Sequence, residues 1–124
     1  REGNLAVVHA RPGDCWRAPG IEASEAELAE TYGPLGAAVV VYGHTHVPGV
    51  RRLSERLVVV NAGSVGLPFD GDARASYALV EGETATIRRV EYDVERELSE
   101  LAACGLPGAA WTARMLRARG ATMP

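Results

Sequence analysis

The sequence predicts an α/β fold in which a strand–helix–strand unit is followed by antiparallel hairpins and two carboxyl-terminal helices. Residues 5–8 and 37–42 are short, continuously apolar runs, typical of strands buried on both faces of a parallel sheet. A helix signal lies between them, and such crossover units normally have parallel strands. Beyond residue 47, shorter apolar runs alternate with turn residues, which favours antiparallel pairs.

The first helix is predicted to begin after Ser24. Ser24 and Glu27 have the spacing of a capping box, in which each side chain satisfies a backbone N–H at the helix start. The helix is expected to end near Tyr32, where Gly33 would supply a left-handed stop and Pro34 would prevent continuation.

Two hairpins are expected after residue 47. The first has a turn at Ser54 and Glu55, and the second turns at Gly82 and Glu83. Their strands are predicted to span residues 50–53 with 57–60, and residues 76–81 with 84–92.

Two helices complete the chain. Asp93 is a good N-cap for the first, which would end at Gly105, and Gly108 precedes the second. The packing stripe of the last helix is predicted to be Trp111, Met115 and Ala118.

Length and composition predict one domain over residues 1–124 and narrow the possible partners. The chain has 13 basic residues, all arginine, against 16 acidic ones, so its net charge of −3 does not favour nucleic acid. No apolar run is long enough for a membrane span, and we expect a cytoplasmic protein. Cys15 and Cys104 lack the spacing of a disulfide framework or a zinc ribbon.

The histidines are the first candidates for chemistry. His9, His44 and His46 all lie at or just beyond the carboxyl end of a predicted buried strand. Ligands bind at that edge of open α/β sheets, and neutral imidazoles are common ligands of zinc, iron and nickel. The alternative at this point is that the three are loop or core histidines without a ligand.

The loop at residues 61–66 is a second candidate. Its sequence, NAGSVG, offers a side-chain amide, small residues and backbone N–H groups, which suit an anion. The alternative is a glycine-rich turn without a ligand.

Taken in order, these motifs resemble a known family. His9 with Pro12 and Trp16 beyond it, then VVVYGHTHVP, VVNAGSVGLP and DGDARASYALVE, resemble the small bacterial and archaeal phosphodiesterase-like branch of the calcineurin-like metallophosphoesterases. The resemblance covers essentially the whole chain. It implies half of a four-layer αββα sandwich and a centre of two divalent metal ions, commonly manganese, iron, zinc or nickel. It also implies hydrolysis of phosphomonoesters or phosphodiesters by a metal-activated hydroxide.

The resemblance further implies roles for individual residues. His9 and His44 would ligate one metal ion and His46 the other. The residues beside the phosphate or the substrate would be Asn61, Gly63, Ser64 and Trp16. The chain departs from the family at Ala10 and Arg11, where the family usually has a Gly and a Ser.

The family's amino-terminal motifs, D-x-H, G-D-x-x-D and G-N-H-D/E, have no equivalent here. Two ions about 3.5 to 4 Å apart need a bridging carboxylate, which three imidazoles cannot provide. We therefore interpret the chain as the carboxyl-terminal half of such an enzyme, inactive alone. Its expected partners are the missing amino-terminal half and a small phosphoester, with self-association as a further expectation.

Two other interpretations remain open from the residues alone. His9, His44 and His46 could hold a single zinc ion with an open position for water, as in a mononuclear hydrolase or lyase. Alternatively, the chain could be a noncatalytic structural or interaction fragment.

Overall fold

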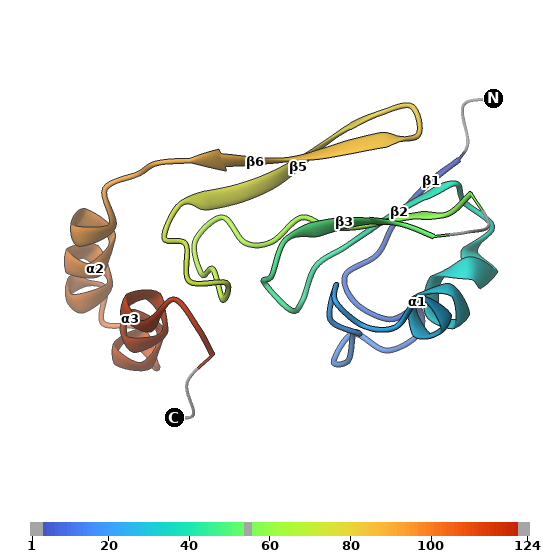
Figure 1. The fold of residues 1–124 in the computed structure, drawn as a ribbon. Coiled ribbons are helices and arrows are strands. Elements are labelled where there is room, and N and C mark those ends of the chain that lie inside the picture. The colour runs from blue at the N-terminus through green and yellow to red at the C-terminus, as the bar shows by residue number, and fades with distance from the viewer. Residues whose placement is uncertain (1–3, 54–55, 122–124) are drawn as a thin grey trace.

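The computed structural model describes residues 4–53 and 56–121 and confirms the α/β class (Figure 1). Its elements in chain order are β1 (Leu5–Val7), α1 (Glu25–Tyr32), the 3₁₀ turn η1 (Gly33–Leu35), β2 (Val39–Tyr42), β3 (Gly49–Arg52), β4 (Val58–Asn61), β5 (Ala75–Glu81), β6 (Thr84–Val90), α2 (Val94–Ala103) and α3 (Ala109–Ala118). Helix α1 covers one face of the first sheet, the β5–β6 hairpin lies over the other, and α2 and α3 lie beyond the end of the hairpin (Figure 1).

The first sheet has four strands in the order β1-β2-β4-β3. Strands β1, β2 and β4 are parallel, and β3 pairs antiparallel with β4 at one edge. The predicted crossover is therefore confirmed. Because the three parallel strands share a direction, the segments that follow Val7, Tyr42 and Asn61 all leave the sheet at the same end, where the strands have their carboxyl ends. This end of the sheet is called its carboxyl edge below.

Strands β2 and β4 are buried on both faces, as their apolar runs predict. On the α1 side, Leu28 packs with Val40 and Val59. On the hairpin side, Val58 and neighbouring valines pack against Ile87 and other apolar residues of β5 and β6. The core thus consists of two layers separated by the parallel strands.

The prediction of two-sided burial is wrong for β1. Leu5 is 53% exposed and Val7 is 70% exposed. Strand β1 lies at the edge of the sheet, and the apolar cluster under the hairpin centres on Val39, Val58 and Val60 of β2 and β4. One face of β1 is therefore uncovered in the described part of the chain.

Helix α1 has its predicted bounds, but its stop differs. The Ser24 hydroxyl accepts the N–H of Glu27 at 3.2 Å, as the capping box predicts. Gly33 is not left-handed: its φ is −55°, and the chain continues as η1 until Gly36, whose φ is +66°. Proline fits the first turn of a helix but removes an N–H, so Pro34 permits this tighter turn and ends the α-helix.

At the carboxyl end, Asp93 caps α2 by accepting the N–H of Arg96 at 2.9 Å. The predicted packing stripe of α3 is only partly correct, because Trp111 is 36% exposed and Ala118 is exposed. The buried residues are Ala113, Met115 and Leu116. Leu98 of α2 packs against Ala113 and Leu116 of α3, so the face of α3 that is buried differs from the predicted one.

Two further sequence predictions concern the first hairpin turn and membrane spans. The turn at Ser54 and Glu55 lies outside the described residues. Among the helices that the structure describes, none has both the length and the apolarity of a membrane span.

The close approach of β3 to the loop before α1 gives a testable prediction. A Cβ at Gly49 would lie 2.7 Å from Cγ1 of Ile21, which is buried, so Gly49→Ala forces the core apart. We expect a loss of about 1–3 kcal/mol in the free energy of unfolding, measured by urea denaturation. Gly66→Ala is the matched control, since a Cβ there meets nothing within 4 Å. Equal stability of the two variants would contradict this packing.

Candidate metal-binding site

The parallel ladder brings the first two histidines together. It continues past the strand ends, where the N–H of Gly43 donates to the carbonyl of His9 at 3.0 Å. The rings of His9 and His44 then meet edge to face, with centroids 5.3 Å apart and planes at 80°. His9 is exposed and His44 is half-buried, so this pair lies at the surface of the carboxyl edge.

The segment Gly43–His46 forms a tight, strained turn. His44 and His46 have φ angles of +66° and +58°, in the left-handed region. The N–H of Thr45 donates to the carbonyl of Gly43 at 2.8 Å, which closes a three-residue turn centred on His44. Each left-handed non-glycine residue costs about 1–2 kcal/mol, so the turn needs support from outside itself.

Asn61 supplies that support. Its side chain is fully buried, and Nδ2 donates to the carbonyl of Gly43 at 3.0 Å and to Oγ1 of Thr45 at 2.8 Å. Its Oδ1 accepts the N–H of Gly63 at 2.9 Å. Both N–H groups of the amide therefore hold residues 43–46, called the histidine turn below, at the end of β4.

The rest of the predicted anion loop is joined to β5. Gly63 has a φ of +77°, and a Cβ there would lie 2.8 Å from Oγ of Ser76. The buried Ser76 donates its hydroxyl to the carbonyl of Ala62 and its N–H to the carbonyl of Ser64, both at 2.9 Å. The Ser64 hydroxyl accepts the N–H of Leu67 at 3.0 Å. This loop is thus held by the protein's own contacts.

The ring of His46 is fixed from the other side. Its Nδ1 lies 2.8 Å from the carbonyl oxygen of Leu67, and its ring stacks on Phe69 with centroids 4.7 Å apart. A carbonyl can only accept, so Nδ1 carries the proton in this contact, and in the neutral imidazole Nε2 is then the nitrogen with the lone pair. Metal-binding histidines are commonly oriented in this way, by donating the other ring N–H to a backbone carbonyl.

Sequence reasoning missed several residues of this arrangement. Thr45 and Ser76 act through hydroxyl groups that carry no motif of their own. Leu67 acts through its backbone carbonyl, which has no signal in a sequence. Phe69 is the one phenylalanine of the chain, and its place beside the motif loop was the only available signal.

Trp16 lies apart from this network. It belongs to the loop between β1 and α1, where Asp14 accepts its backbone N–H at 2.9 Å, and its side chain is 85% exposed. Its role as a wall of the substrate pocket stays a prediction.

The donor set fits part of a metal centre. Imidazoles suit divalent transition ions, and the ring contacts described above present three of them at one edge of the sheet. Across residues 4–53 and 56–121, however, no three His, Cys, Asp or Glu side chains come close enough to hold one ion. The three imidazoles are therefore not gathered as the single-zinc interpretation requires, and no described carboxylate completes the His9–His44 pair.

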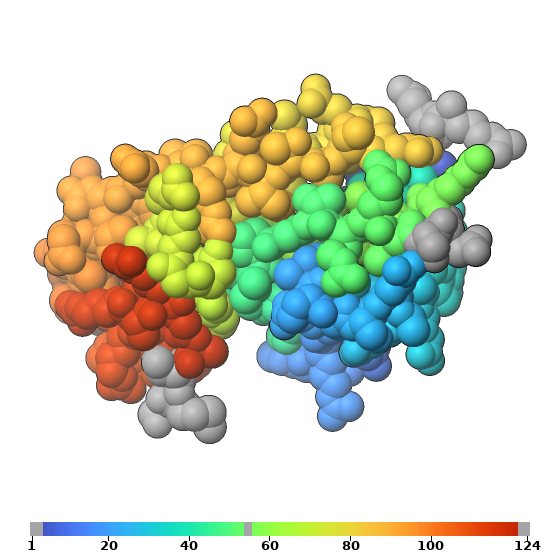
Figure 2. All heavy atoms as spheres, in the orientation of Figure 1, coloured from blue at the N-terminus to red at the C-terminus, as the bar shows by residue number. Residues whose placement is uncertain are grey.

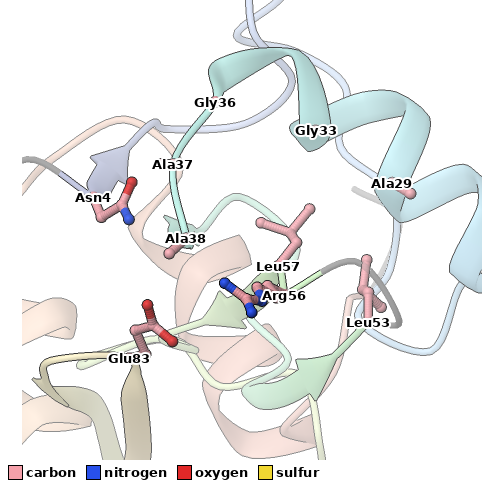
Figure 3. A pocket seen from close by; sticks show the side chains of 10 residues that line it. All are labelled: Asn4, Ala29, Gly33, Gly36, Ala37, Ala38, Leu53, Arg56, Leu57 and Glu83. Atoms are coloured by element: carbon pink, nitrogen blue, oxygen red, sulfur yellow. The ribbon is translucent and has the colours of Figure 1, made fainter.

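A cavity of about 500 Å³ lies at the amino ends of the parallel strands, opposite the carboxyl edge (Figure 3). Its lining includes Asn4, Ala38 and Leu57, which immediately precede β1, β2 and β4. Arg56 and Glu83 extend toward the same space in Figure 3. Because the histidines follow the carboxyl ends of these strands, this cavity does not belong to the candidate site.

Comparisons with known proteins agree with the fold. The chain is similar to a metallophosphoesterase crystal structure from Sphaerobacter thermophilus, with a TM-score of 0.76 and 27% identity. It is also similar in fold to a hypothetical protein from Pyrococcus horikoshii, with a TM-score of 0.75 and 18% identity. These matches cover 96% and 90% of this chain but only 57% and 45% of the two solved chains. No curated protein sequence matches significantly.

The family assignment comes from the sequence profile of the calcineurin-like phosphoesterase superfamily domain. This profile matches residues 1–85, more than half of the chain, and that range contains all three histidines and the residue 61–66 loop. The resemblance carried by these motifs is thereby confirmed, and the chain belongs to the calcineurin-like phosphoesterase superfamily.

Proposed function

We propose that this chain supplies the imidazole ligands of a metal-dependent phosphoesterase that hydrolyses phosphomonoesters or phosphodiesters at a two-metal site. The observation that carries the proposal is the ring geometry at the carboxyl edge. His9 and His44 meet edge to face, and His46 is held through Nδ1 so that Nε2 is left for a ligand. The chain belongs to a superfamily of phosphoesterases, so we propose that these imidazoles bind the divalent ions that hydrolysis of a phosphoester would use.

In this proposal, His9 and His44 bind one divalent ion and His46 binds the other. When bound, manganese, iron, zinc or nickel would activate a water for attack on phosphorus and offset charge on the phosphoryl oxygens. Asn61 holds the turn that carries His44. The loop that includes Gly63 and Ser64 lies beside the phosphate, and Trp16 borders the substrate.

The site still needs a bridging carboxylate and further ligands, because imidazoles cannot bridge two cations this close together. No described carboxylate joins the histidine pair. The chain also spans only 57% of the metallophosphoesterase from Sphaerobacter thermophilus. We therefore propose that the carboxylates come from the missing amino-terminal half that the family motifs imply, and that the substrate is a small phosphoester.

Removal of His44 tests the ligand assignment. The variant His44→Ala deletes one ring of the edge-to-face pair but leaves the backbone turn closed by Asn61. Even residues that only orient metal ligands contribute 10- to 100-fold in affinity, so we expect at least about a 100-fold loss. The measurement is Mn²⁺ titration of the whole protein by calorimetry.

Cys104→Ser is the matched control for His44→Ala. Its thiol is exposed and could bind metal adventitiously, but it lies after α2 and outside the histidine turn. We expect this variant to bind Mn²⁺ as the unmodified protein does. Unchanged Mn²⁺ affinity in His44→Ala would show that the ligand assignment is wrong.

Loss of the Asn61 amide tests how the turn is supported. In Asn61→Asp, a carboxylate oxygen would face the Gly43 carbonyl where an N–H group now donates, so one buried acceptor loses its donor. We expect a loss of about 3 kcal/mol in the free energy of unfolding and weaker Mn²⁺ binding. Thr45→Ser keeps the hydroxyl that Asn61 contacts and should cost less than about 1 kcal/mol. A fully stable Asn61→Asp variant would contradict the role of the amide.

The need for carboxylates predicts the activity of residues 1–124 alone. With excess Mn²⁺ and bis-p-nitrophenyl phosphate, we expect hydrolysis near background, because the second ion is not held and the attacking water is not aligned. Adding the upstream half, or joining it covalently, should raise the rate. Robust hydrolysis by residues 1–124 that is abolished by His44→Ala would instead favour the single-zinc interpretation.

A further inference from the structure

Helices α2 and α3 lie outside residues 1–85, the part of the chain that matches the superfamily profile. They nevertheless reach the candidate site. Figure 2 shows the yellow-green segment near residue 70 seated against the orange and red helices. This segment, residues 67–72, connects the residue 61–66 loop with β5.

The segment contacts His46 in three ways. The Leu67 carbonyl fixes Nδ1, the Phe69 ring stacks on the imidazole, and the N–H of Phe69 donates to the His46 carbonyl at 3.2 Å. Both the ring and the backbone of His46 therefore depend on where residues 67–69 lie.

The position of Leu67 depends in turn on the two helices. Its side chain packs against the cluster formed by Leu98 of α2 with Ala113 and Leu116 of α3. Its own N–H is held by the Ser64 hydroxyl at 3.0 Å. The Leu67 carbonyl belongs to the peptide bond with Pro68, whose side chain is fully buried. The packing of the Leu67 side chain against α2 and α3 is therefore the contact through which these helices act on that carbonyl.

Arg119 makes a second connection from α3 to the segment. It is the C-cap of α3, with a φ of +52°, and its carbonyl accepts the N–H of Gly71 at 3.1 Å. Its guanidinium Nη1 donates back to the Gly71 carbonyl at 3.4 Å. Gly71 is thus held at both of its backbone polar groups by one residue.

Arg89 of β6 and Arg74, which immediately precedes β5, also hold this segment, but further along. Asp70 pairs with Arg89, and Asp72 pairs with Arg74 at 2.6 Å. The hydrogen bonds from Arg74 hold the pKa of the Asp72 carboxyl below its usual range, so this pair stays ionised at neutral pH. The end of the segment around Gly71 is therefore anchored both by these ion pairs and by Arg119 of α3, whereas the Leu67 side chain packs against the helix cluster.

We infer that α2 and α3 are the support that fixes the ring orientation of His46, with Leu67 and Arg119 as positioning residues. The helices select the Nδ1–H form of the imidazole by holding the Leu67 carbonyl against it, which leaves Nε2 as the nitrogen for a ligand. The effect on metal binding rests on the proposed function, but the effect on the ring does not.

The test uses the whole protein and two variants, each with a matched control, together with one conservative rescue. Leu67→Ala removes the packing on the helices and keeps the carbonyl, and Leu67→Met is the conservative rescue. The matched control is Leu106→Ala, since Leu106 is 66% exposed in the connection between α2 and α3. Arg119→Gly keeps a residue suited to positive φ and removes the guanidinium, with exposed Arg117→Ala as its control.

Two measurements separate the inference from the proposed function. The tautomer of His46 is read in the metal-free protein from two-bond ¹⁵N–¹H couplings, assigned by the signals lost in His46→Gln. Mn²⁺ affinity is measured by calorimetry. We expect Leu67→Ala and Arg119→Gly to convert a single Nδ1–H form into a mixture and to weaken Mn²⁺ binding about tenfold, with Leu67→Met and both controls unchanged.

Each outcome has one meaning. An unchanged tautomer in Leu67→Ala overturns the inference, even if stability or Mn²⁺ affinity falls, because the helices would then be only structural. If the tautomer changes but Mn²⁺ affinity does not, the inference that α2 and α3 orient the His46 ring stands. The proposed function is then wrong in making His46 a metal ligand. If Leu67→Ala does not fold, the tautomer in Arg119→Gly decides in the same way.

Discussion

The buried amide of Asn61 is the interaction on which the geometry of the strand ends depends. It joins the end of β4 to the turn after β2, and β1 joins that turn through the bond from Gly43 to His9. The left-handed angles of His44 and His46 cost about 1–2 kcal/mol each. The hydrogen bonds of the amide contribute about 1 kcal/mol each, which is close to that cost. The hydrogen bonds of this one side chain therefore offset much of the strain in the turn, and the bond from the Phe69 N–H to the His46 carbonyl adds to them.

A second support comes from outside the parallel strands. Ser76 of β5 binds the loop after Asn61 through two backbone carbonyls, and Gly63 lies so close to it that no side chain fits between them. The same loop continues into the segment that contacts His46 and the terminal helices. The first sheet thus brings the histidines to one edge, while the hairpin and the helices determine how the loops there are held.

The sequence could predict the parts of this arrangement that depend on local pattern. The apolar runs before His9 and His44 predicted parallel strands, and chain direction alone then placed the histidines at one edge. It could not predict the exposure of Val7, because burial of an edge strand depends on what covers it. Nor could it find the Leu67 carbonyl or the buried stripe of α3, since a backbone oxygen has no sequence signal and the stripe was rotated by contact with Leu98.

The exposed face of β1 bears on how the metal centre would be completed. Side chains alternate along a strand, and the ladder continues to His9, so Leu5, Val7 and His9 share one face. Leu5 and Val7 are largely exposed there, while the other face of β1 packs toward α1 through Ala6 and Val8. A protein layer that covered these two side chains would also extend over the His9–His44 pair. In the proposed two-metal enzyme, carboxylates carried on that layer would lie beside the exposed His9 ring, so burial of β1 and completion of the ligand set would occur together.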